Sequence, residues 1–294
     1  MSFYVELGEG RFQATERTSG PWDPKHQHAG PPSALVLREL ERMASDLVIA
    51  RITVEILGPV PIGELVVSTG VERPGRSVEL LTATLSADGR DVLRARAWRV
   101  RPSPVGTETG EPVALPEAED VPPRQLGEAF GYAHAVEWRW VRGGWLDRGP
   151  AAVWTRMRIP LVEGEEPSPR QRVLVVADSG NGVSNVLDWG RYLFINTDLT
   201  VHFVRQPVGE LRAQRPDGTG CARRTGAVRR ATMTRPSAFG ASVIERCLVS
   251  SACGDPGCSS TTASAIARST HFISYSAKVA PRQRRTPPPN GIHV

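Results

Sequence analysis

The sequence predicts an α+β protein that uses one plan twice: a helix followed by antiparallel strands. An amphipathic helix pattern at 30–47 precedes four strand-like runs joined by short turns. A second glycine-opened helix, expected at 182–189, is again followed by a strand-like run at 192–204. A Pro/Glu-rich linker at 102–133 separates the two copies. Their sequence identity is low, so the repetition is one of element order.

In the first half, residues 1–101, the helix begins at Gly30, and the next two residues are prolines. Proline fits a first helical turn because its missing N–H group would have had no helical partner there. Apolar residues then recur at helical spacing for about four turns: Leu37, Leu40, Ala44 and Leu47. Strands are expected at 51–56, 64–72, 77–86 and 92–101, and Asp88-Gly89 marks a hairpin between the last two. The simplest arrangement lays the helix across the apolar face of this sheet.

The second half, residues 134–210, is organised around the stretch 173–205. Strand-like runs at 134–141 and 152–159 lead to an apolar run that ends at Asp178, where a helix is expected to begin. After residue 210, Arg, Ser, Pro and Gly dominate and regular alternation fades. Residues 211–294 are therefore interpreted as an atypical basic tail with one remaining strand at 239–250.

Composition is typical of a globular protein with a sizeable core, at 40% hydrophobic and 23% charged residues over 294 positions. No apolar run reaches the length of a membrane span, and the first residues lack the features of a signal peptide, so we expect no membrane span and a cytoplasmic location. The tail 211–294 holds 13 basic and 3 acidic residues, which leaves 23 basic and 28 acidic residues in 1–210. An acidic body argues against a nucleic-acid partner.

All four cysteines lie in the tail, and Cys253 and Cys258 flank a GDPG sequence. This spacing fits neither a zinc knuckle nor a redox pair, and no histidine stands at ligand spacing. We therefore expect no metal and no redox cofactor.

Asp178 is the residue with the most informative surroundings. A helix N-terminus presents unpaired N–H groups and a partial positive charge, which can hold an oxygen that is becoming negative. A carboxylate beside it can deprotonate a water aimed at a carbonyl carbon, which suits hydrolysis of an acyl group. The alternative is that Asp178 only caps its helix, and the local pattern alone favours capping.

Four phrases add a more specific indication: HAGPPSALVLREL at 28–40, VEILGPVPIGELVVSTGVERPGRSVELLTATL at 54–85, PSPRQRVLVVADSGNGVSNVLD at 167–188 and FINTDLTVHFVRQPVGE at 194–210. In this order and spacing they resemble the double-hotdog acyl-CoA thioesterase-like family of actinobacteria, distant relatives of thioesterase II. The resemblance covers about residues 10–210. It implies a tandem (double) hotdog, with each half a long helix wrapped by an antiparallel sheet. It also implies a function in lipid metabolism, namely hydrolysis of a fatty or related acyl-CoA.

In thioesterase II the working residues are an Asp, a Thr on the following strand and a Gln near the C-terminus. By this resemblance the Asp is Asp178, and Asn196 stands at the Thr position with Thr197 and Thr200 as neighbours. The Gln has no clear counterpart in the segment 239–250, where Ser242, Ile244 and Glu245 lie near the expected place. Asp178 would then activate water, and Asn196 with Thr197 or Thr200 would hold it. Backbone N–H groups near Asn181 and Gly182 would receive the thioester oxygen.

His28 and Gly30, at the entry of the first helix, are candidates to line the acyl site. A rival hypothesis is a hotdog enoyl-CoA hydratase or dehydratase, in which His28 acts as the base with an Asp. Equally, His26 and His28 are explained as exposed loop residues. A third hypothesis is a non-catalytic acyl-CoA-binding protein, favoured by the missing Gln. Because hotdog sheets usually pair along their edges, a homodimer is expected.

Overall fold

The structure is a computed structural model, and it describes most of the first two thirds of the chain and four strands beyond. The described residues are 1–102, 116, 118–124, 130–145, 147–149, 151–183, 187–188, 190–203 and 207, with the strands at 240–242, 244–250, 260–267 and 271–281. The helices are α1 (Gly30–Arg42), α2 (Gly131–Ala135), α3 (Pro169–Ala177) and α4 (Gly180–Val183), with 3-10 turns η1 (Glu16–Thr18) and η2 (Ala118–Asp120). None of the helices among these residues is long and apolar enough to span a membrane.

Six strands come from the first 100 residues: β1 (Tyr4–Gly8), β2 (Arg11–Ala14), β3 (Val48–Ile56), β4 (Glu64–Arg73), β5 (Val78–Ala87) and β6 (Arg90–Val100). The later strands are β7 (Val136–Arg142), β8 (Ala152–Met157), β9 (Tyr192–Asn196), β10 (Asp198–Phe203), β11 (Gly240–Ser242), β12 (Ile244–Ser250), β13 (Ser260–Ala267) and β14 (His271–Pro281). The described strands make one long sheet in the order β1-β2-β4-β5-β6-β3-β10-β14-β13-β12, in which β9 also pairs with β14. A separate small sheet has the order β11-β8-β7.

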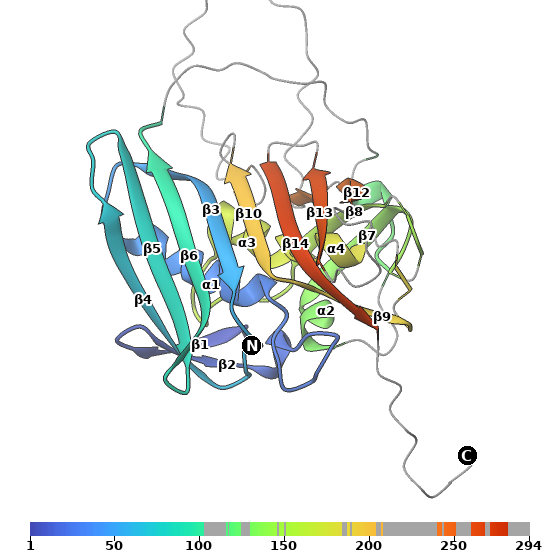
Figure 1. The fold of residues 1–294 in the computed structure, drawn as a ribbon, viewed down its shortest axis with the longest axis horizontal. Coiled ribbons are helices and arrows are strands. Elements are labelled where there is room, and N and C mark those ends of the chain that lie inside the picture. The colour runs from blue at the N-terminus through green and yellow to red at the C-terminus, as the bar shows by residue number, and fades with distance from the viewer. Residues whose placement is uncertain are drawn as a thin grey trace, which may run out of the picture.

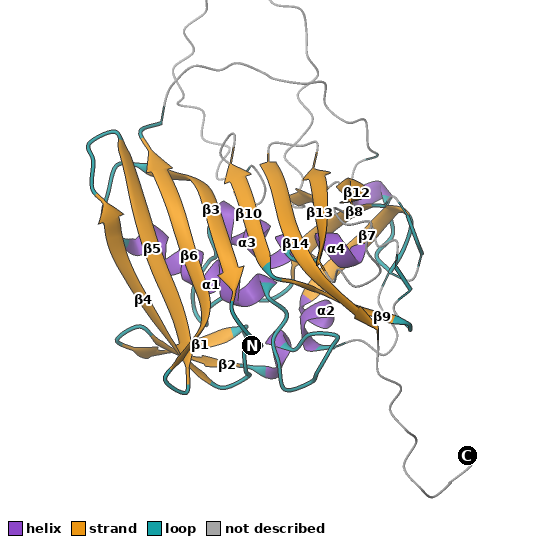
Figure 2. Cartoon of the chain, in the orientation of Figure 1, coloured by secondary structure: helices purple, strands orange, loops and turns teal. Residues whose placement is uncertain are grey.

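The two halves of the chain meet where β3 pairs with β10. The pairing is antiparallel and places Thr53 opposite Thr200 and Val54 opposite Leu199. Figure 1 shows the long sheet as a curved layer, with α1 and α3 on one of its faces. Figure 2 shows that strands make up a larger part of the structure than helices. The sheet is therefore continuous across the boundary between the halves.

The elements predicted for the first half are confirmed. In β6 the buried Leu93, Ala95 and Ala97 alternate with exposed Arg94 and Arg96, as a half-buried strand requires. Its hairpin to β5 turns at Asp88-Gly89, where both residues have positive φ, +50° and +73°, as a type I′ turn demands. Helix α1 ends at Arg42, so the predicted stripe residues Ala44 and Leu47 lie beyond it.

The second helix lies earlier in the chain than the sequence pattern predicted. Helix α3 spans Pro169–Ala177, and Asp178 is its C-terminal cap instead of the start of a helix. Ser168 opens α3 with a capping box that includes Gln171, and Pro169 occupies the first turn. The apolar run at 173–177 is rich in valine, yet its burial against α1 and the sheet overrides that weak helix propensity. The predicted helix at 182–189 is wrong: α4 is only Gly180–Val183, and 184–186 and 189 lie outside the described residues.

The segment 211–294, for which one strand at 239–250 is predicted, contains four described strands. The predicted strand corresponds to β11 and β12, whereas β13 and β14 were not foreseen. Strand β14 lies inside the long sheet, paired with β10 from Thr200↔Ser274 to Phe203↔His271 and with β13 on its other side. The tail therefore supplies a central strand of the sheet. The division of the chain at 101, 133 and 210 stays a prediction.

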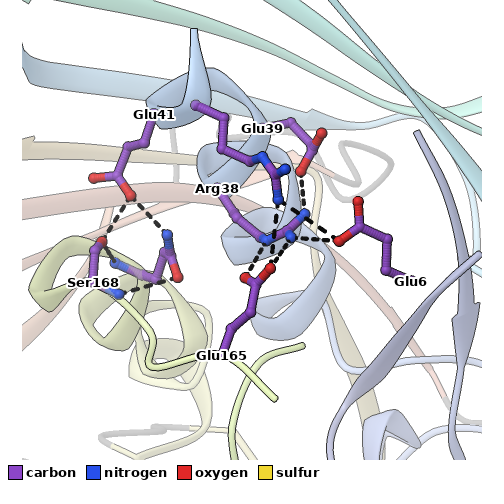
Figure 3. Close-up of polar contacts among 8 residues, drawn as sticks. Glu6, Arg38, Glu39, Glu41, Glu165 and Ser168 are labelled. Carbon is purple, nitrogen blue, oxygen red and sulfur yellow. Dashed lines mark hydrogen bonds and ion pairs between the residues drawn. The ribbon is translucent and has the colours of Figure 1, made fainter. Parts of the chain in front are cut away.

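Helices α1 and α3 pack antiparallel, and polar contacts join the C-terminal end of α1 to the N-terminal end of α3. Glu41, in the last turn of α1, accepts hydrogen bonds from Ser168 Oγ at 2.7 Å and Gln171 Nε2 at 2.8 Å. One turn earlier, buried Arg38 donates to Glu165, which lies in the loop before α3. Arg38 also binds Glu6 of β1 and its neighbour Glu39 (Figure 3). These contacts hold the N-terminal end of α3 against the last turns of α1.

Candidate functional site

The C-terminal end of α3 meets the N-terminal end of α1, and Asp178 lies at this junction. Its Oδ2 accepts a hydrogen bond of 3.1 Å from the backbone N–H of Ala29, the residue that precedes α1. The approach is close because Gly30 has no side chain: a Cβ there would come within 2.0 Å of the carbonyl oxygen of Val175. Asp178 therefore faces a helix N-terminus as expected, but that of the first helix, 149 residues away along the chain.

The N-terminus of α1 has few N–H groups to offer. Pro31 and Pro32 have none, and the N–H of Ser33 already donates to the carbonyl oxygen of Ala29 at 3.2 Å. The N–H of Gly30 donates to Nδ1 of His28 at 3.2 Å. The first turn thus directs two backbone donors toward the junction, from Ala29 and Gly30. The 13-residue helix behind them adds the positive end of its dipole.

Asn196 holds the other carboxylate oxygen of Asp178. Its Nδ2 donates to Oδ1 of Asp178 at 2.7 Å and to the backbone oxygen of the same residue at 3.1 Å. Its own Oδ1 accepts from Nδ2 of Asn181 at 3.0 Å. Both amide hydrogens of Asn196 are used, so its contacts fix the carboxylate and leave no N–H for a water.

Thr197 and Thr200 do not join this group. Thr197 is exposed, and its hydroxyl donates to the carbonyl oxygen of Ser276 in β14 at 3.2 Å. The hydroxyl of Thr200 donates to that of Thr53 across the β3–β10 pairing at 3.0 Å. Of the three neighbouring polar residues, only Asn196 contacts Asp178.

His28 is part of the site and is not an exposed loop residue. Its Nδ1 lies 3.3 Å from Oδ2 of Asp178, and its side chain is 11% exposed. The ring stacks on Tyr132 of α2, with centroids 3.8 Å apart and planes 5° from parallel. Its Nε2 lies 3.4 Å from Oγ of Ser179, which in turn lies 2.7 Å from the hydroxyl of Tyr132.

Burial sets the protonation of the two rings. It lowers the pKa of His28, and the negative charge of Asp178 offsets part of that shift. The imidazole is therefore neutral near pH 7. Burial also raises the pKa of Tyr132, whose hydroxyl keeps its proton and donates to the carbonyl oxygen of Val175 at 3.1 Å.

The N–H groups expected to receive a thioester oxygen are not suited to it. The N–H of Gly182, inside α4, donates to the carbonyl oxygen of Ser179 at 2.9 Å. Asn181 is linked to Asn196 through its side chain, and α4 is a single turn. The donors placed next to Asp178 are those of Ala29 and Gly30. Gly30 thus stays in the site through its backbone, and Gly182 does not.

The segment 239–250 does not contain the glutamine that the resemblance to thioesterase II implies. Residues 244–250 form β12, which lies at the far end of the long sheet, and the side chains of 240–250 are outside the described part. The last strand among the described residues is β14, and its sequence, HFISYSAKVAP, contains no glutamine. In β14, Ala277 pairs with Asn196.

Three parts of this site were not predicted from the sequence: the Ala29 N–H, Tyr132 and the hydroxyl of Ser179. Tyr132 reaches the site from 46 residues upstream of Asp178, through α2. Ser179 directly follows Asp178, so its adjacency was the one usable clue. The described residues include no group of His, Cys, Asp and Glu that could hold a metal ion.

The geometry allows acid–base chemistry at a carbonyl. The side chain of Asp178 is buried, with 8% of its surface exposed. Each of its oxygens accepts one N–H bond and keeps a further lone pair for a water. The N–H groups of Ala29 and Gly30 already donate to Asp178 and His28, so the positive end of the α1 dipole is what would stabilise a polarised carbonyl oxygen beside the carboxylate.

Comparison with known protein families and structures identifies the chain's relatives. The acyl-CoA thioesterase N-terminal domain matches residues 18–100, and the acyl-CoA thioesterase C-terminal domain matches 109–220. A comparison with curated proteins gives no match.

Solved structures share the fold at low sequence identity. A hot dog fold protein of unknown function from Alicyclobacillus acidocaldarius is 15% identical, with a TM-score of 0.62 over 95% of this chain and 96% of its own. A putative thioesterase II from Thermobifida fusca is 14% identical, with a TM-score of 0.63 over 94% and 95%. Acyl-CoA thioesterase II TesB2 from Mycobacterium marinum is 12% identical, with a TM-score of 0.56 over 96% of both chains. With a tandem hotdog fold and both domains matched in order, the chain belongs to the acyl-CoA thioesterase family.

Proposed function

We propose that the chain hydrolyses the thioester of a fatty or related acyl-CoA, with Asp178 as the base that activates the water. The observation that carries the proposal is the position of Asp178 against the N-terminus of α1, held by Ala29 and Asn196. A fixed carboxylate can orient and deprotonate a water, and the positive end of the helix beside it can stabilise a carbonyl oxygen that becomes negative.

In this mechanism the thioester oxygen lies at the N-terminus of α1, and water lies against Asp178. Asp178 takes a proton from the water while the water oxygen bonds to the carbonyl carbon of the thioester. The carbonyl oxygen becomes negative and is stabilised by the helix end. The C–S bond then breaks, and the CoA thiolate takes the proton back. Asn196 acts by orienting the carboxylate, and Thr197 and Thr200 have no part.

A second candidate is an enoyl-CoA hydratase or dehydratase, and one contact favours it. That chemistry depends on a paired His and Asp, and His28 Nδ1 lies 3.3 Å from Asp178 Oδ2. A non-catalytic acyl-CoA-binding protein is the third candidate, since β14 has no glutamine to complete the set of thioesterase II.

One assay separates the three candidates. The purified chain is incubated with a panel of short, long and branched acyl-CoAs and enoyl-CoAs, and free thiol and loss of the enoyl absorbance are recorded together. A thioesterase releases thiol, a hydratase removes enoyl absorbance without releasing thiol, and a binder does neither. We expect thiol release. Its absence across the panel, with a folded protein, would remove the proposed function.

A further inference from the structure

His28 is a buried ionisable group that the hydrolysis above does not use. Four groups face it: the Asp178 carboxylate from the end of α3, Ser179 after it, Tyr132 from α2, and the N–H of Gly30 at the start of α1. His26, two residues earlier, is 40% exposed and lies 3.6 Å from Asp23 instead. The contrast shows that the site holds one histidine of the pair and leaves the other at the surface.

The hydrogen bonds assign the proton of His28. Because Nδ1 accepts from the N–H of Gly30, the proton of the neutral ring lies on Nε2. Nε2 then donates to Ser179 Oγ, Ser179 donates to the hydroxyl of Tyr132, and Tyr132 donates to the carbonyl oxygen of Val175. Every donor hydrogen in this series of hydrogen bonds has an acceptor.

The opposite tautomer has fewer hydrogen bonds. A proton on Nδ1 would point to Asp178 in an arrangement of Ser179, His28 and Asp178 that resembles a catalytic triad. It would leave the N–H of Gly30 without its acceptor. It would also make Ser179 turn its hydrogen from Tyr132 to Nε2. The resting site therefore keeps Nδ1 unprotonated, with its lone pair accepting from the N–H of Gly30, at 3.3 Å from Oδ2 of Asp178.

From this geometry we propose that His28 is a positioning residue for Asp178 that takes up the water proton at Nδ1 during thioester hydrolysis and thereby releases the N–H of Gly30. The inference rests on the proposed function. Water gives its proton to Asp178, and Asp178 passes it through Oδ2 to Nδ1. A protonated Nδ1 cannot accept a hydrogen bond, so the N–H of Gly30 becomes free. It is freed at the N-terminus of α1 as the carbonyl oxygen becomes negative.

The cycle closes without any other reactant. When the C–S bond breaks, the proton returns from Nδ1 through Asp178 to the thiolate sulfur, and Gly30 again donates to Nδ1. The products are a carboxylic acid and free CoA. His28 must be neutral at the start of each cycle, so the rate falls when it is already protonated.

The test uses His28→Asn. The asparagine carbonyl oxygen can take the place of Nδ1 as acceptor for Gly30, but it does not accept a proton at these pH values. We expect kcat to fall at least about tenfold with KM unchanged within about twofold, because the step affected is proton transfer. The wild-type log kcat should fall at a pH below the ordinary histidine range, because burial lowers the pKa of His28, and this fall should be absent from the variant. His26→Asn, the matched control, should keep the wild-type rate and pH profile.

The outcomes separate this inference from the proposed function. If the wild type hydrolyses acyl-CoA and His28→Asn has the same kcat and pH profile, the role of His28 is wrong and the function stands. If the wild type releases no thiol from any acyl-CoA, the proposed function fails and the inference fails with it.

A second measurement needs neither substrate nor a folded His28 variant. ¹⁵N chemical shifts of the histidine rings in the full wild-type chain should show His28 neutral at pH 7 with its proton on Nε2. Asp178→Asn should lower the pKa of His28 further, because the charge that raises it is gone. A proton on Nδ1, or a pKa that Asp178→Asn leaves unchanged, would overturn the inference.

Discussion

Both ends of the antiparallel pair α1 and α3 bury polar side chains, but they bury different kinds. At the C-terminal end of α1, Arg38 is enclosed by the carboxylates of Glu6, Glu39 and Glu165 (Figure 3). At the N-terminal end, one carboxylate, Asp178, is held by neutral donors and lies beside a neutral imidazole.

The difference distinguishes an end that stabilises the fold from an end that can take part in proton transfer. Around Arg38 the guanidinium and the carboxylates form ion pairs, so we expect no proton transfer between these groups near pH 7. Around Asp178 the compensating groups are N–H dipoles and an imidazole that is neutral near pH 7 because burial lowers the pKa of His28. That end can accept a proton without losing an ion pair. We therefore expect changes at the Arg38 end to affect stability, and changes at the Asp178 end to affect turnover.

The largest effect on stability is expected from Arg38→Met. It leaves three carboxylates around a side chain that is 3% exposed and has lost its charge, which costs about 3–5 kcal/mol of unfolding free energy. Urea unfolding measures this loss. The control Arg94→Met removes a 58% exposed partner of Asp91 and should cost under about 1 kcal/mol. Equal losses in the two variants would refute the structural role of Arg38. The fraction that stays folded should retain wild-type kcat.

Gly30→Ala tests the junction between the helices directly. A Cβ at this position would lie 2.0 Å from the Val175 carbonyl oxygen, so α1 and α3 must separate. We expect a loss of about 2 kcal/mol in stability and a fall in kcat, since Asp178 and Ala29 move apart with the helices. At Gly58, where an added Cβ meets nothing within 4 Å, the same substitution should leave kcat unchanged. If Gly30→Ala is as active as Gly58→Ala, the close approach has no catalytic importance.

Asn196→Ala should have the smallest effect of the three. It removes two hydrogen bonds to Asp178 but leaves the carboxylate and its bond to Ala29 in place. We predict a fall in kcat of about tenfold, which is about 1.4 kcal/mol in the activation barrier. Thr197→Ala, at the adjacent exposed position, should change kcat by less than about twofold. A result in which Thr197→Ala is the more harmful change would contradict the assignment of Asn196.

The sequence predicted the first helix and the four strands after it because their signals are local, but it did not predict β1 and β2. Alternation in β6 and the Asp88-Gly89 turn are read from neighbouring residues. Helix α3 was missed although Ser168 and Gln171 spell a capping box, since the valine-rich run after them looks like a strand. Strands β13 and β14 were missed because their small residues carry a weak pattern, and β14 pairs with β10 some 70 positions away.

For the site, residue types were easier to predict than contacts. Asp178, Asn196 and His28 were identified, and the structure brings them together. Their partners Tyr132 and the Ala29 N–H were not, because they meet Asp178 and Ser179 only through the packing of α1, α2 and α3. The receiving N–H groups were placed at Gly182 for the same reason: the helix N-terminus that faces Asp178 belongs to the other half of the chain.

The central claim is that the Asp178 carboxylate activates water for thioester hydrolysis, and its most direct test is thiol release by Asp178→Asn. Asparagine keeps the shape and can still accept the N–H of Ala29, but its NH2 group then faces Nδ2 of Asn196, so unfolding in urea is measured beside turnover to show that the variant is folded. We predict a kcat at least about tenfold below wild type, with Asp91→Asn, a surface carboxylate bound to Arg94, at the wild-type rate. Wild-type thiol release from a folded Asp178→Asn protein would contradict the account.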